Sequence, residues 1–426
     1  MDAVVVGAGL AGLAAAETLA DAGLQVVVLE RGDAPGSKNV TGGRLYVDSV
    51  RDLFPEWWEE APLERPVTHE AWTLLDEGRS LRLDFQDEGL GGERPRSYTV
   101  LRARLDGWLA ERVGAKGAYV IPQKPVTELL REGGAVAGVR VDGEDIPAHA
   151  VIACDGLLSF VGKAGGLRDR PAPRTVAIGV KEVVGLPSGV IEDRFQLEAG
   201  EGCAELFVGT VTRGLLGGGF CYTNRDSLSL GLVVGVGDLM EKGASMKVPE
   251  LYEAFKAHPR VRSLVRGGEL LEYSAHLIPE GGLDAVPPLA ADGLLLAGDA
   301  AGLALNMGYT VRGMEFAIAS GRMAAEAVIE ARERGDWSEA GLAGYPRRLR
   351  ESFVWKYLEA YRGMPRLLEN PALFDRYPRE VCGLLGDLVR LEKGRPGKVS
   401  SKLWGFLRRN VLNWGDLKAL APWRKI

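Results

Sequence analysis

The sequence predicts an α/β fold with a doubly wound parallel sheet, an inserted β-rich domain and a C-terminal helical region. Three observations predict it. An apolar strand, a glycine-rich turn and an Ala/Leu-rich helix open the chain, and a similar strand followed by a Gly-Asp pair occurs near residue 298. Between these units lies a long strand-like stretch rich in glycine. After Tyr345 the pattern is helical to the end, interrupted by prolines.

The first unit is predicted from its apolar periodicity. Ala3–Val6 form a short buried strand, Leu10–Ala22 a helix, and Leu24–Leu29 a second buried strand. A strand, a turn, a helix and a second strand in this order begin a parallel sheet whose strands are covered on both faces.

The turn of this unit carries Gly7-x-Gly9-x-x-Gly12. Gly7 permits a tight turn, Gly9 lets the backbone approach a pyrophosphate, and Gly12 lets the helix pack closely on the strand. The helix N-terminus offers its partial positive charge to phosphates. Glu30 ends the second strand, 18 residues after Gly12, where a carboxylate can hold a ribose hydroxyl. The unit therefore predicts a dinucleotide site, with these cofactor-binding residues: Gly7, Ala8, Gly9, Ala11, Gly12, Glu30 and Arg31.

Two later strands end in an acid beside a glycine. The buried strand Leu294–Ala297 leads into Gly298-Asp299, and the strand that ends at Cys154 leads into Asp155-Gly156. Asp299 is well placed for a ligand hydroxyl, or it caps the helix that follows. Asp155-Gly156 is either part of the same site or an ordinary turn.

The remaining segments complete the domain plan. Residues 36–46 form a glycine-rich loop, residues 98–113 a strand end and a helix, and residues 119–153 alternate as strands. A long helix is expected from about Val311 to Arg334. The cofactor domain is expected to be discontinuous, with these boundaries: 1–80, 98–170 and 284–330 for the cofactor domain, 81–97 and 171–283 for the β-rich domain, and 331–426 for the helical region, with breaks at Pro365, Pro371, Pro378 and Pro396.

Composition and charge exclude several classes of protein. The chain is 46% hydrophobic and 26% charged, as soluble globular proteins are, and no run of 18 apolar residues predicts a spanning helix. The N-terminus lacks the basic region and cleavage site of a signal peptide. Although the net charge is −6, nine Lys/Arg and one acid from Lys393 onward give +8, which leaves −14 for residues 1–392. This split indicates a basic tail with an interaction role.

The four cysteines, Cys154, Cys203, Cys221 and Cys382, show no C-x-x-C spacing. They predict neither an iron–sulfur ligand run nor a disulfide framework, and a reducing cytoplasmic compartment is expected. A second glycine motif is absent as well, because Val233–Gly237 lacks the third glycine. A separate NAD(P)H domain is therefore not expected, and the electrons come from elsewhere.

The three motifs, in this order and at these spacings, resemble those of the flavoprotein family of aromatic hydroxylases, geranylgeranyl reductases and electron-transfer flavoprotein:quinone oxidoreductases. The resemblance implies FAD rather than NAD. It implies that the first motif binds the ADP half and that Gly298-Asp299 binds the ribityl and pyrophosphate portion. It also implies an arginine contact, for which we favour Arg102 over Arg104, and a strand at Val126 that passes the adenine.

Longer segments resemble the FixC branch of that family over essentially the whole chain: Lys38–Tyr46, Gly217–Leu232, Glu272–His276, Pro279–Gly282, Asn306–Met314 and Leu368–Phe374. This resemblance implies an electron relay, in which FAD accepts electrons from a heterodimeric electron-transfer flavoprotein and delivers them to menaquinone or ubiquinone. Mitochondrial-type members carry a C-terminal iron–sulfur domain, from which this chain departs. The departure implies a complex with a small ferredoxin-like iron–sulfur subunit.

The resemblance also implies where the flavin ring and the quinone lie. We expect these residues against the cofactor: Thr41, Gly42, Gly43, Arg102, Val126, Asp155, Gly156, Gly298, Asp299, Asn306, Met307 and Gly308. Phe220, Tyr222 and His276 are candidates for the quinone pocket, although the two aromatic residues also suit ordinary sheet core and the histidine a structural role. No catalytic nucleophile, metal or nucleic-acid partner is expected.

The tail at residues 402–426 mixes basic residues with Trp404, Trp414 and Trp423. A basic amphipathic helix with tryptophan fits a membrane interface, or it docks on another subunit. We expect a cytoplasmic protein held on the inner face of the cell membrane. Two rival functions stay open: a geranylgeranyl-type reductase, although Gly219–Asn224 lacks the Trp and Pro typical of that branch, and a non-catalytic flavoprotein scaffold.

Overall fold

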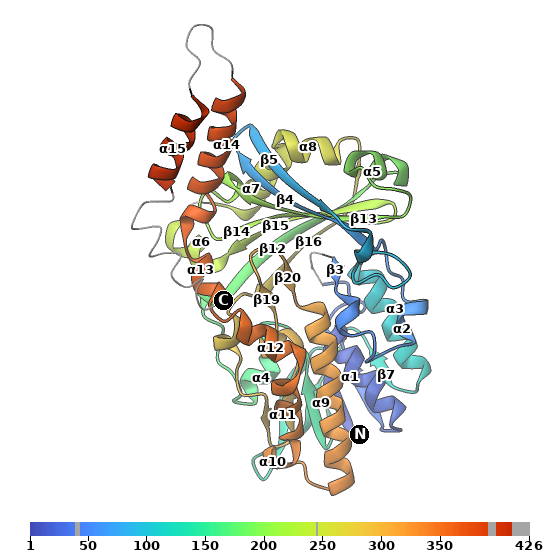
Figure 1. The fold of residues 1–426 in the computed structure, drawn as a ribbon. Helices are drawn as coiled ribbons and strands as arrows, with labels where there is room; N and C mark the ends of the chain where they lie inside the picture. The colour runs from blue at the N-terminus through green and yellow to red at the C-terminus, as the bar shows by residue number, and fades with distance from the viewer. Residues whose placement is uncertain (39–42, 244–245, 391–397, 411–426) are drawn as a thin grey trace.

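The computed structural model describes residues 1–38, 43–243, 246–390 and 398–410 (Figure 1). The predicted α/β fold is confirmed. A domain built on a six-stranded sheet lies at one end, a domain built on a seven-stranded sheet lies beside it, and helices of the C-terminal region run along both (Figure 1). No helix of the described segments is long and apolar enough to pass through a lipid bilayer.

The six-stranded sheet has the strand order β17-β18-β11-β1-β2-β7. Its strands are β17 (Ala290–Ala291), β18 (Leu294–Leu296), β11 (Ala150–Ala153), β1 (Ala3–Val6), β2 (Val26–Leu29) and β7 (Tyr119–Ile121). All neighbours pair in parallel except β17 and β18. Every residue of β1, β2, β11 and β18 is buried, as expected for a sheet that is covered on both faces.

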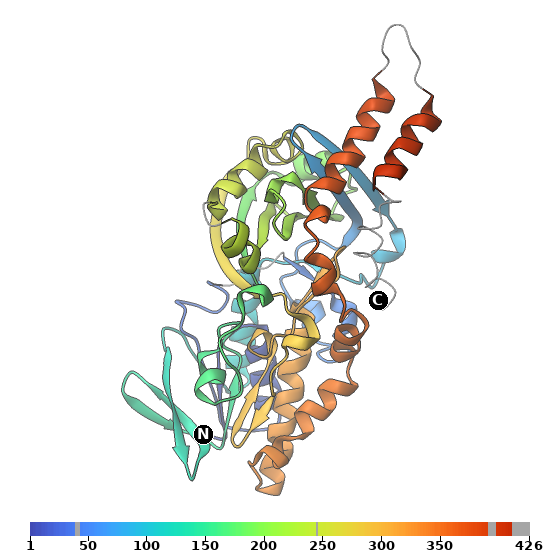
Figure 2. The ribbon, with the colours of Figure 1, turned by 90° about the vertical axis from the view of Figure 1, so that its left-hand side faces the viewer.

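Helices cover one face of this sheet and a small sheet covers the other. Helix α1 (Leu10–Asp21) contacts both α3 (Arg102–Ala115) and α9 (Met314–Arg334). On the opposite face β11 contacts the middle strand of a three-stranded antiparallel sheet, whose strands are β8 (Val126–Glu132), β9 (Ala135–Val141) and β10 (Glu144–Pro147) (Figure 2). Helix α9 begins three residues later than predicted, because Val311–Arg312 form strand β20 of a short hairpin with β19 (Leu305–Asn306).

Close packing around the start of α1 depends on two glycines. A Cβ at Gly12 would lie 1.9 Å from the Gly7 carbonyl oxygen. A Cβ at Gly321 would lie 2.0 Å from the Ala11 carbonyl oxygen. Both positions therefore exclude any side chain. Gly12 lets α1 lie close to the turn after β1, and Gly321 lets the α9 backbone approach the start of α1.

The seven-stranded sheet has the order β16-β12-β15-β14-β13-β4-β5. Its strands are β16 (Glu269–Pro279), β12 (Val176–Gly185), β15 (Ser227–Gly235), β14 (Gly217–Thr223), β13 (Gly202–Gly209), β4 (Val67–Asp76) and β5 (Arg79–Gln86). Neighbours are antiparallel except β13 and β4. Strand β4 pairs along its whole length with β5 and β13, so the boundary expected at residue 80 lies before residue 67.

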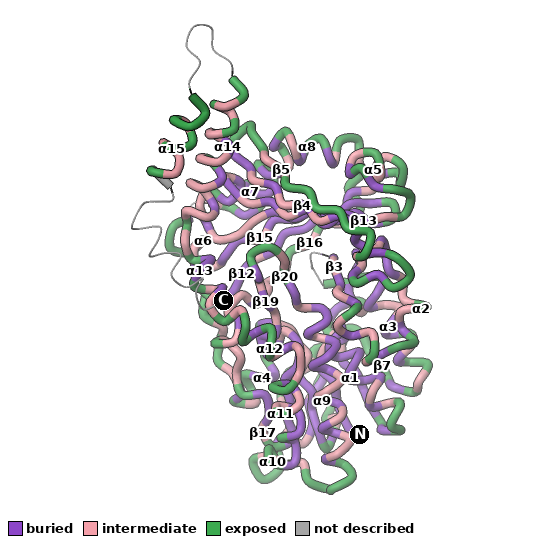
Figure 3. Tube along the Cα trace, viewed as in Figure 1, coloured by how far each residue is buried: buried purple, intermediate pink, exposed green. Residues whose placement is uncertain are grey.

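One face of the seven-stranded sheet is covered by helices that we did not predict. Within residues 171–283 they are α5 (Ser188–Phe195), α6 (Val236–Lys242), α7 (Val248–Ala257) and α8 (Pro259–Val265). They are short and lie among glycine-rich strands, which hides their periodicity. Tyr252, Phe255 and Val261 from α7 and α8 are buried against sheet residues of this face. The central strands of this sheet are largely buried (purple in Figure 3).

The C-terminal region is helical, as predicted. Its helices are α10 (Glu339–Leu342), α11 (Gly344–Glu351), α12 (Phe353–Ala360), α13 (Met364–Leu368), α14 (Arg376–Val389) and α15 (Val399–Asn410). Pro365 and Pro378 lie in first turns, where a missing backbone N–H costs no helical hydrogen bond. Helices α10 and α11 pack on α9, whereas α14 packs on β4 and β13. The hairpin of α14 and α15 projects from the body (Figure 2).

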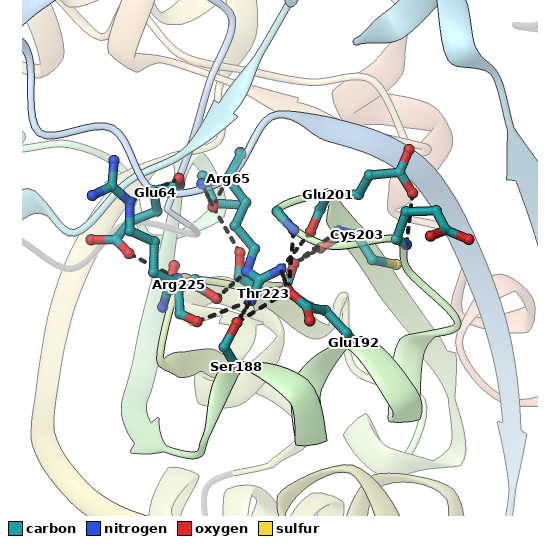
Figure 4. A network of polar contacts seen from close by, with 12 residues as sticks. Glu64, Arg65, Ser188, Glu192, Glu201, Cys203, Thr223 and Arg225 are labelled. Atoms are coloured by element: carbon teal, nitrogen blue, oxygen red, sulfur yellow. Dashed lines mark hydrogen bonds and ion pairs between the residues drawn. The ribbon is translucent and has the colours of Figure 1, made fainter.

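Arg65 connects the first segment of the chain to the β-rich domain (Figure 4). Its side chain is 2% exposed, and each of its five N–H groups can be assigned an acceptor. The acceptors are the Asn224 carbonyl at 2.6 Å, the Glu192 carboxylate at 2.8 Å, the Glu201 carbonyl at 2.9 Å, the Ser188 hydroxyl at 2.8 Å and the Arg225 carbonyl at 3.0 Å. This buried arginine therefore joins the segment before β4 to α5 and to the β14–β15 turn.

Candidate functional site

A cleft with a volume of about 400 Å³ opens between the carboxyl ends of β1, β2 and β11 and the uncovered face of the seven-stranded sheet. That volume is within the usual range of small-molecule pockets, roughly 300–1,000 Å³. Most predicted site residues line it: Gly7, Gly9, Ala11, Glu30, Arg31, Arg102, Val126, Asp155, Gly156, Phe220, Tyr222, His276 and Asp299. Ends of parallel strands meet at one edge, which is why motifs far apart in sequence converge there.

Other predicted residues do not line the cleft. Gly12 packs α1 against the turn after β1, and Gly298, with φ +62°, would place a Cβ 2.8 Å from that of Ala11. Gly43, with φ +78°, lies against the Val100 carbonyl. Ala8, Asn306, Met307 and Gly308 also do not line the cleft, and Thr41 and Gly42 lie outside the described residues.

The turn after β1 is held by the neighbouring Cys154 backbone and by the Glu30 carboxylate. Gly7 has φ +104°, and a Cβ there would lie 2.3 Å from the Cys154 carbonyl oxygen. One oxygen of the Glu30 carboxylate accepts the Ala8 N–H at 2.9 Å, and the other accepts the Gly32 N–H at 2.6 Å. Glu30 therefore orders the turn while it faces the cleft.

The Asp155 carboxylate accepts hydrogen bonds from neighbouring groups of the chain. It accepts the Ser159 hydroxyl at 2.8 Å and the Val161 N–H at 3.0 Å, at the start of α4 (Phe160–Ala164). Burial raises the pKa of Asp155, and these hydrogen bonds oppose the rise. Gly156, with φ +78°, has open space beside it, so this turn offers its backbone to the cleft.

Asp299 and His276 meet across the cleft from the two domains. Burial raises the pKa of Asp299 and lowers the pKa of His276, and their mutual attraction partly offsets both shifts. Arg168, which we did not predict, donates to the carbonyl oxygens of Asp299 and Ala300. No local sequence pattern marks Arg168, because it reaches this segment from 131 residues away.

The structure separates the two candidate arginines. Arg102 lines the cleft and makes two hydrogen bonds to the Asp106 carboxylate, at 2.7 and 2.6 Å. Arg104 is 57% exposed, pairs with Glu64 at 3.2 Å and does not line the cleft. The geometry therefore favours Arg102.

The far end of the cleft is aromatic. Phe220 and Tyr222 stack with ring centroids 5.3 Å apart. Opposite them the Arg44 guanidinium lies 4.4 Å above the Tyr46 ring and makes a paired contact with the Glu70 carboxylate. Burial raises the pKa of Tyr222, so its phenol stays protonated at neutral pH.

The cleft suits a ligand with a diphosphate and an apolar ring system. Its charged lining is mainly basic: Arg31, Lys38, Arg44, Arg102, Lys124 and Arg312, against the acids Glu30, Asp155 and Asp299. The N-termini of α1 and α9, at Gly9 and Gly313, both open on it and add partial positive charge. Gly313 before a long helix was the signal that could have identified this second helix N-terminus at the cleft.

Comparisons with known proteins agree with this fit. Residues 1–195 match the FAD binding domain family. The chain is 47% identical to the probable electron transfer flavoprotein-quinone oxidoreductase YdiS of Escherichia coli, over 94% of this chain and 93% of that protein. It is 41% identical to protein FixC of Bradyrhizobium diazoefficiens, over 98% and 96% of the two chains. The expected cofactor, FAD, and the expected oxidoreductase class are confirmed.

Solved structures share the fold. A geranylgeranyl bacteriochlorophyll reductase-like protein from Thermoplasma acidophilum superposes with a TM-score of 0.71, at 21% identity and 95% coverage of both chains. The myxobacterial chondrochloren halogenase CndH, an FAD-dependent enzyme, gives a TM-score of 0.63 at 20% identity, over 85% of this chain and 82% of that one. At these identities the similarity establishes the α/β architecture.

Proposed function

Since the chain belongs to the FixC family of FAD-dependent oxidoreductases, we propose that it passes electrons from a heterodimeric electron-transfer flavoprotein to a membrane quinone, either menaquinone or ubiquinone. FAD supplies the chemistry, because it accepts and releases electrons singly or in pairs. The observation that carries the proposal is the cleft itself, whose nucleotide end continues into an aromatic end formed by Phe220 and Tyr222.

The chain's own residues would bind and orient the cofactor. The backbone of Gly7–Gly9 and the N-terminus of α1 would face the pyrophosphate, and Glu30 would hold a ribose hydroxyl. Arg102 would bind near the phosphates, and Asp299 would accept a hydrogen bond from the ribityl chain. The sequence-predicted set, including Val126, Gly156 and Gly308, stays our proposal for the cofactor site.

The aromatic end would receive the quinone. The stacked rings of Phe220 and Tyr222 offer an apolar wall, and Tyr222 keeps its phenolic proton. Among the described residues its hydroxyl has no hydrogen-bond partner, so it is available to donate to a carbonyl oxygen of a quinone. His276 lies nearer the nucleotide half, beside Asp299, and it would contact the cofactor rather than the quinone.

An iron–sulfur subunit would act from outside this chain. The four cysteines are unpaired, and three of them are buried. Burial raises the pKa of the Cys154 and Cys203 thiols, which disfavours the thiolate needed to bind a cluster. We therefore retain the small ferredoxin-like subunit as a proposed partner.

The projecting hairpin of α14 and α15 would carry the protein to the inner face of the cell membrane. It exposes apolar side chains, with Val389 77% exposed and Trp404 65% exposed. Lys402 lies on the same helix as Trp404, and Lys398 directly precedes that helix. Trp414 and Trp423 of the predicted tail lie outside the described residues. A chain ending at Arg390 should lose co-sedimentation with anionic vesicles, whereas unchanged binding would remove the arm from the proposal.

Steady-state turnover tests the proposed reaction. Reduced electron-transfer flavoprotein as donor and a short-chain quinone as acceptor should give quinol formation that requires this protein. If the FAD-loaded protein forms no quinol with any quinone, the result would favour the rival function, a non-catalytic scaffold whose FAD is structural.

A second candidate is the reduction of prenyl double bonds, favoured by the close fold of the Thermoplasma acidophilum protein. Incubating the dithionite-reduced protein with a prenylated lipid would reveal it by a mass gain of two hydrogens per reduced bond. We expect no such gain, because β14 carries Gly219–Thr223 without the Trp and Pro typical of that branch.

A further inference from the structure

Glu280 lies where the last strand of the β-rich domain reaches the edge of the cleft. It directly follows β16, of which Ile278 and Pro279 line the cleft. Its backbone N–H donates to the Thr175 carbonyl at 2.9 Å. Its carboxyl oxygen accepts a hydrogen bond from the Asn306 side-chain amide at 3.3 Å.

Asn306 joins Glu280 to the β19–β20 hairpin, which borders the cleft with Ala304, Val311 and Arg312. The amide oxygen of Asn306 accepts the Gly308 N–H at 2.9 Å. This bond orients the amide so that its NH₂ group points at Glu280. Glu280, at the end of β16, is therefore linked to the hairpin through its carboxyl group.

No cation compensates Glu280 among the described residues. The charged side chains on neighbouring elements are already paired, Arg174 with Glu241 at 2.8 Å and Arg362 with Asp284 at 2.7 Å. Burial without an opposite charge raises the pKa of Glu280 to about 7, and the Asn306 bond only partly opposes this rise. Glu280 therefore gains and loses its proton near neutral pH.

The other titratable groups at the cleft have partners or stay in one protonation state. Burial also raises the pKa of Asp155 and Asp299, but hydrogen bonds from Ser159 and Val161 oppose the rise at Asp155, and attraction to His276 opposes it at Asp299. Burial lowers the pKa of His276, which keeps the imidazole neutral, and attraction to Asp299 opposes that shift. Burial raises the pKa of Tyr46 and Tyr222, so their phenols stay protonated. Glu280 is thus suited to respond when the charge in the cleft changes by one electron.

We propose that Glu280 is a proton-loading group of the cleft, which binds a proton from water when an electron enters the cofactor and releases it when the electron leaves. The inference rests on the proposed function for its acceptor. A quinone needs two electrons and two protons to become a quinol. Glu280 would supply one of the two protons: its O–H bond forms with a proton from water as electrons enter the cofactor, and it breaks as an O–H bond forms on one quinone oxygen. Water would supply the second proton, and the electrons would come through the FAD. Asn306 stabilises the carboxylate between turnovers.

Infrared difference spectroscopy of the FAD-loaded full chain tests this without a donor or a quinone. Photoreduction at pH 7 should produce a carboxylic-acid C=O band in the reduced-minus-oxidised spectrum. Glu280→Gln, which keeps the size and the Asn306 hydrogen bond, should abolish that band and lower the protons taken up per two electrons. Glu280→Asp should keep a shifted band.

Glu272→Gln provides the matched control, because Glu272 lies on the same strand and is 41% exposed. This change should leave the band and the proton uptake intact. An unchanged band and unchanged proton uptake in Glu280→Gln, at normal FAD content, would overturn the inference while leaving quinone reduction untouched. Failure of quinone reduction alone would overturn the proposed function and not the photoreduction result.

Discussion

The Ala8 backbone N–H donates to the Glu30 carboxylate at 2.9 Å, which ties the glycine turn after β1 to the end of β2. The other carboxylate oxygen accepts the Gly32 N–H. One side chain therefore orders two backbone segments at the edge of the cleft. Any ligand that uses Glu30 binds a carboxylate already held in place, which limits the entropy lost on binding.

Replacing Glu30 should weaken FAD binding without unfolding the protein. Glu30→Gln loses two charge-assisted hydrogen bonds, and such bonds contribute about 1.5–3 kcal/mol each. We expect the Kd for FAD to rise at least tenfold, measured by quenching of flavin fluorescence during titration of the apoprotein. Asp33→Asn, at an exposed neighbour whose carboxylate accepts a hydrogen bond from the Gln123 amide at 3.5 Å, is the control and should change the Kd little.

Adding one methyl group at Gly12 should destabilise the nucleotide unit. Its Cβ would lie 1.9 Å from the Gly7 carbonyl oxygen, so α1 must move away from β1. Gly12→Ala should lower the free energy of unfolding by about 1–3 kcal/mol, or more where the backbone cannot shift. Gly107→Ala on α3 meets nothing within 4 Å and should be neutral or stabilising in the same urea titrations.

Replacing Arg65 by a residue with fewer hydrogen-bond donors should destabilise the folded protein. Lysine has three donors that cannot reach five acceptors, so buried carbonyls in the β14–β15 turn and the Glu192 carboxylate lose partners. Arg65→Lys should reduce the free energy of unfolding by about 3 kcal/mol. The same change at exposed Arg104 should cost under about 1 kcal/mol. Equal losses at both sites would show that the buried network does not stabilise the domain junction.

Removing the Tyr222 hydroxyl should affect the quinone and spare the cofactor. Tyr222→Phe deletes one hydrogen bond of about 1 kcal/mol, so we expect about a fivefold higher KM for a short-chain quinone, with an unchanged flavin spectrum. Tyr252→Phe removes a hydroxyl on the opposite, helix-covered face of the sheet and should leave the KM unchanged. A normal KM in Tyr222→Phe would place the quinone elsewhere.

Glu280 should make stability depend on pH in a defined window. Its folded-state pKa is raised to about 7 from the ordinary 4.5, so the folded protein retains a proton that the unfolded chain releases. This contribution to stability is fully present below about pH 4.5 and is lost as pH rises through about 7. Glu280→Gln should flatten the decline in unfolding free energy of the apoprotein between about pH 5 and 7.5.

Many residues that the sequence predicted for the cofactor site line the cleft, because they lie close together in short motifs, and their binding to the cofactor stays a prediction. One strand–helix–strand unit contains Gly7, Gly9, Gly12 and Glu30. Each of these residues meets a local steric or electrostatic requirement of that unit. The aromatic end was also anticipated through Phe220 and Tyr222. The basic residues Lys124 and Arg312 were not predicted at the cleft, because they reach it from separate segments without a local sequence pattern.

The boundary that we predicted at residue 80 differs from the structure for a similar reason. Strand β4 resembles the strands around it, and only its pairing with β13, more than 120 residues later, assigns it to the seven-stranded sheet. Helices α7 and α8 are short and interrupted by Pro259, so their periodicity was too brief to recognise. Pairing between strands far apart in sequence explains the position of the boundary, and the shortness of α7 and α8 explains why these helices were missed.

The absorbance of the bound flavin at about 450 nm under anaerobic conditions tests the central claim most directly. The account predicts that reduced electron-transfer flavoprotein bleaches the FAD of this protein, and that a menaquinone or ubiquinone analogue added afterwards restores the oxidised spectrum with formation of quinol. A flavin that stays oxidised in the presence of the reduced donor, or that stays bleached after every quinone is added, would contradict it.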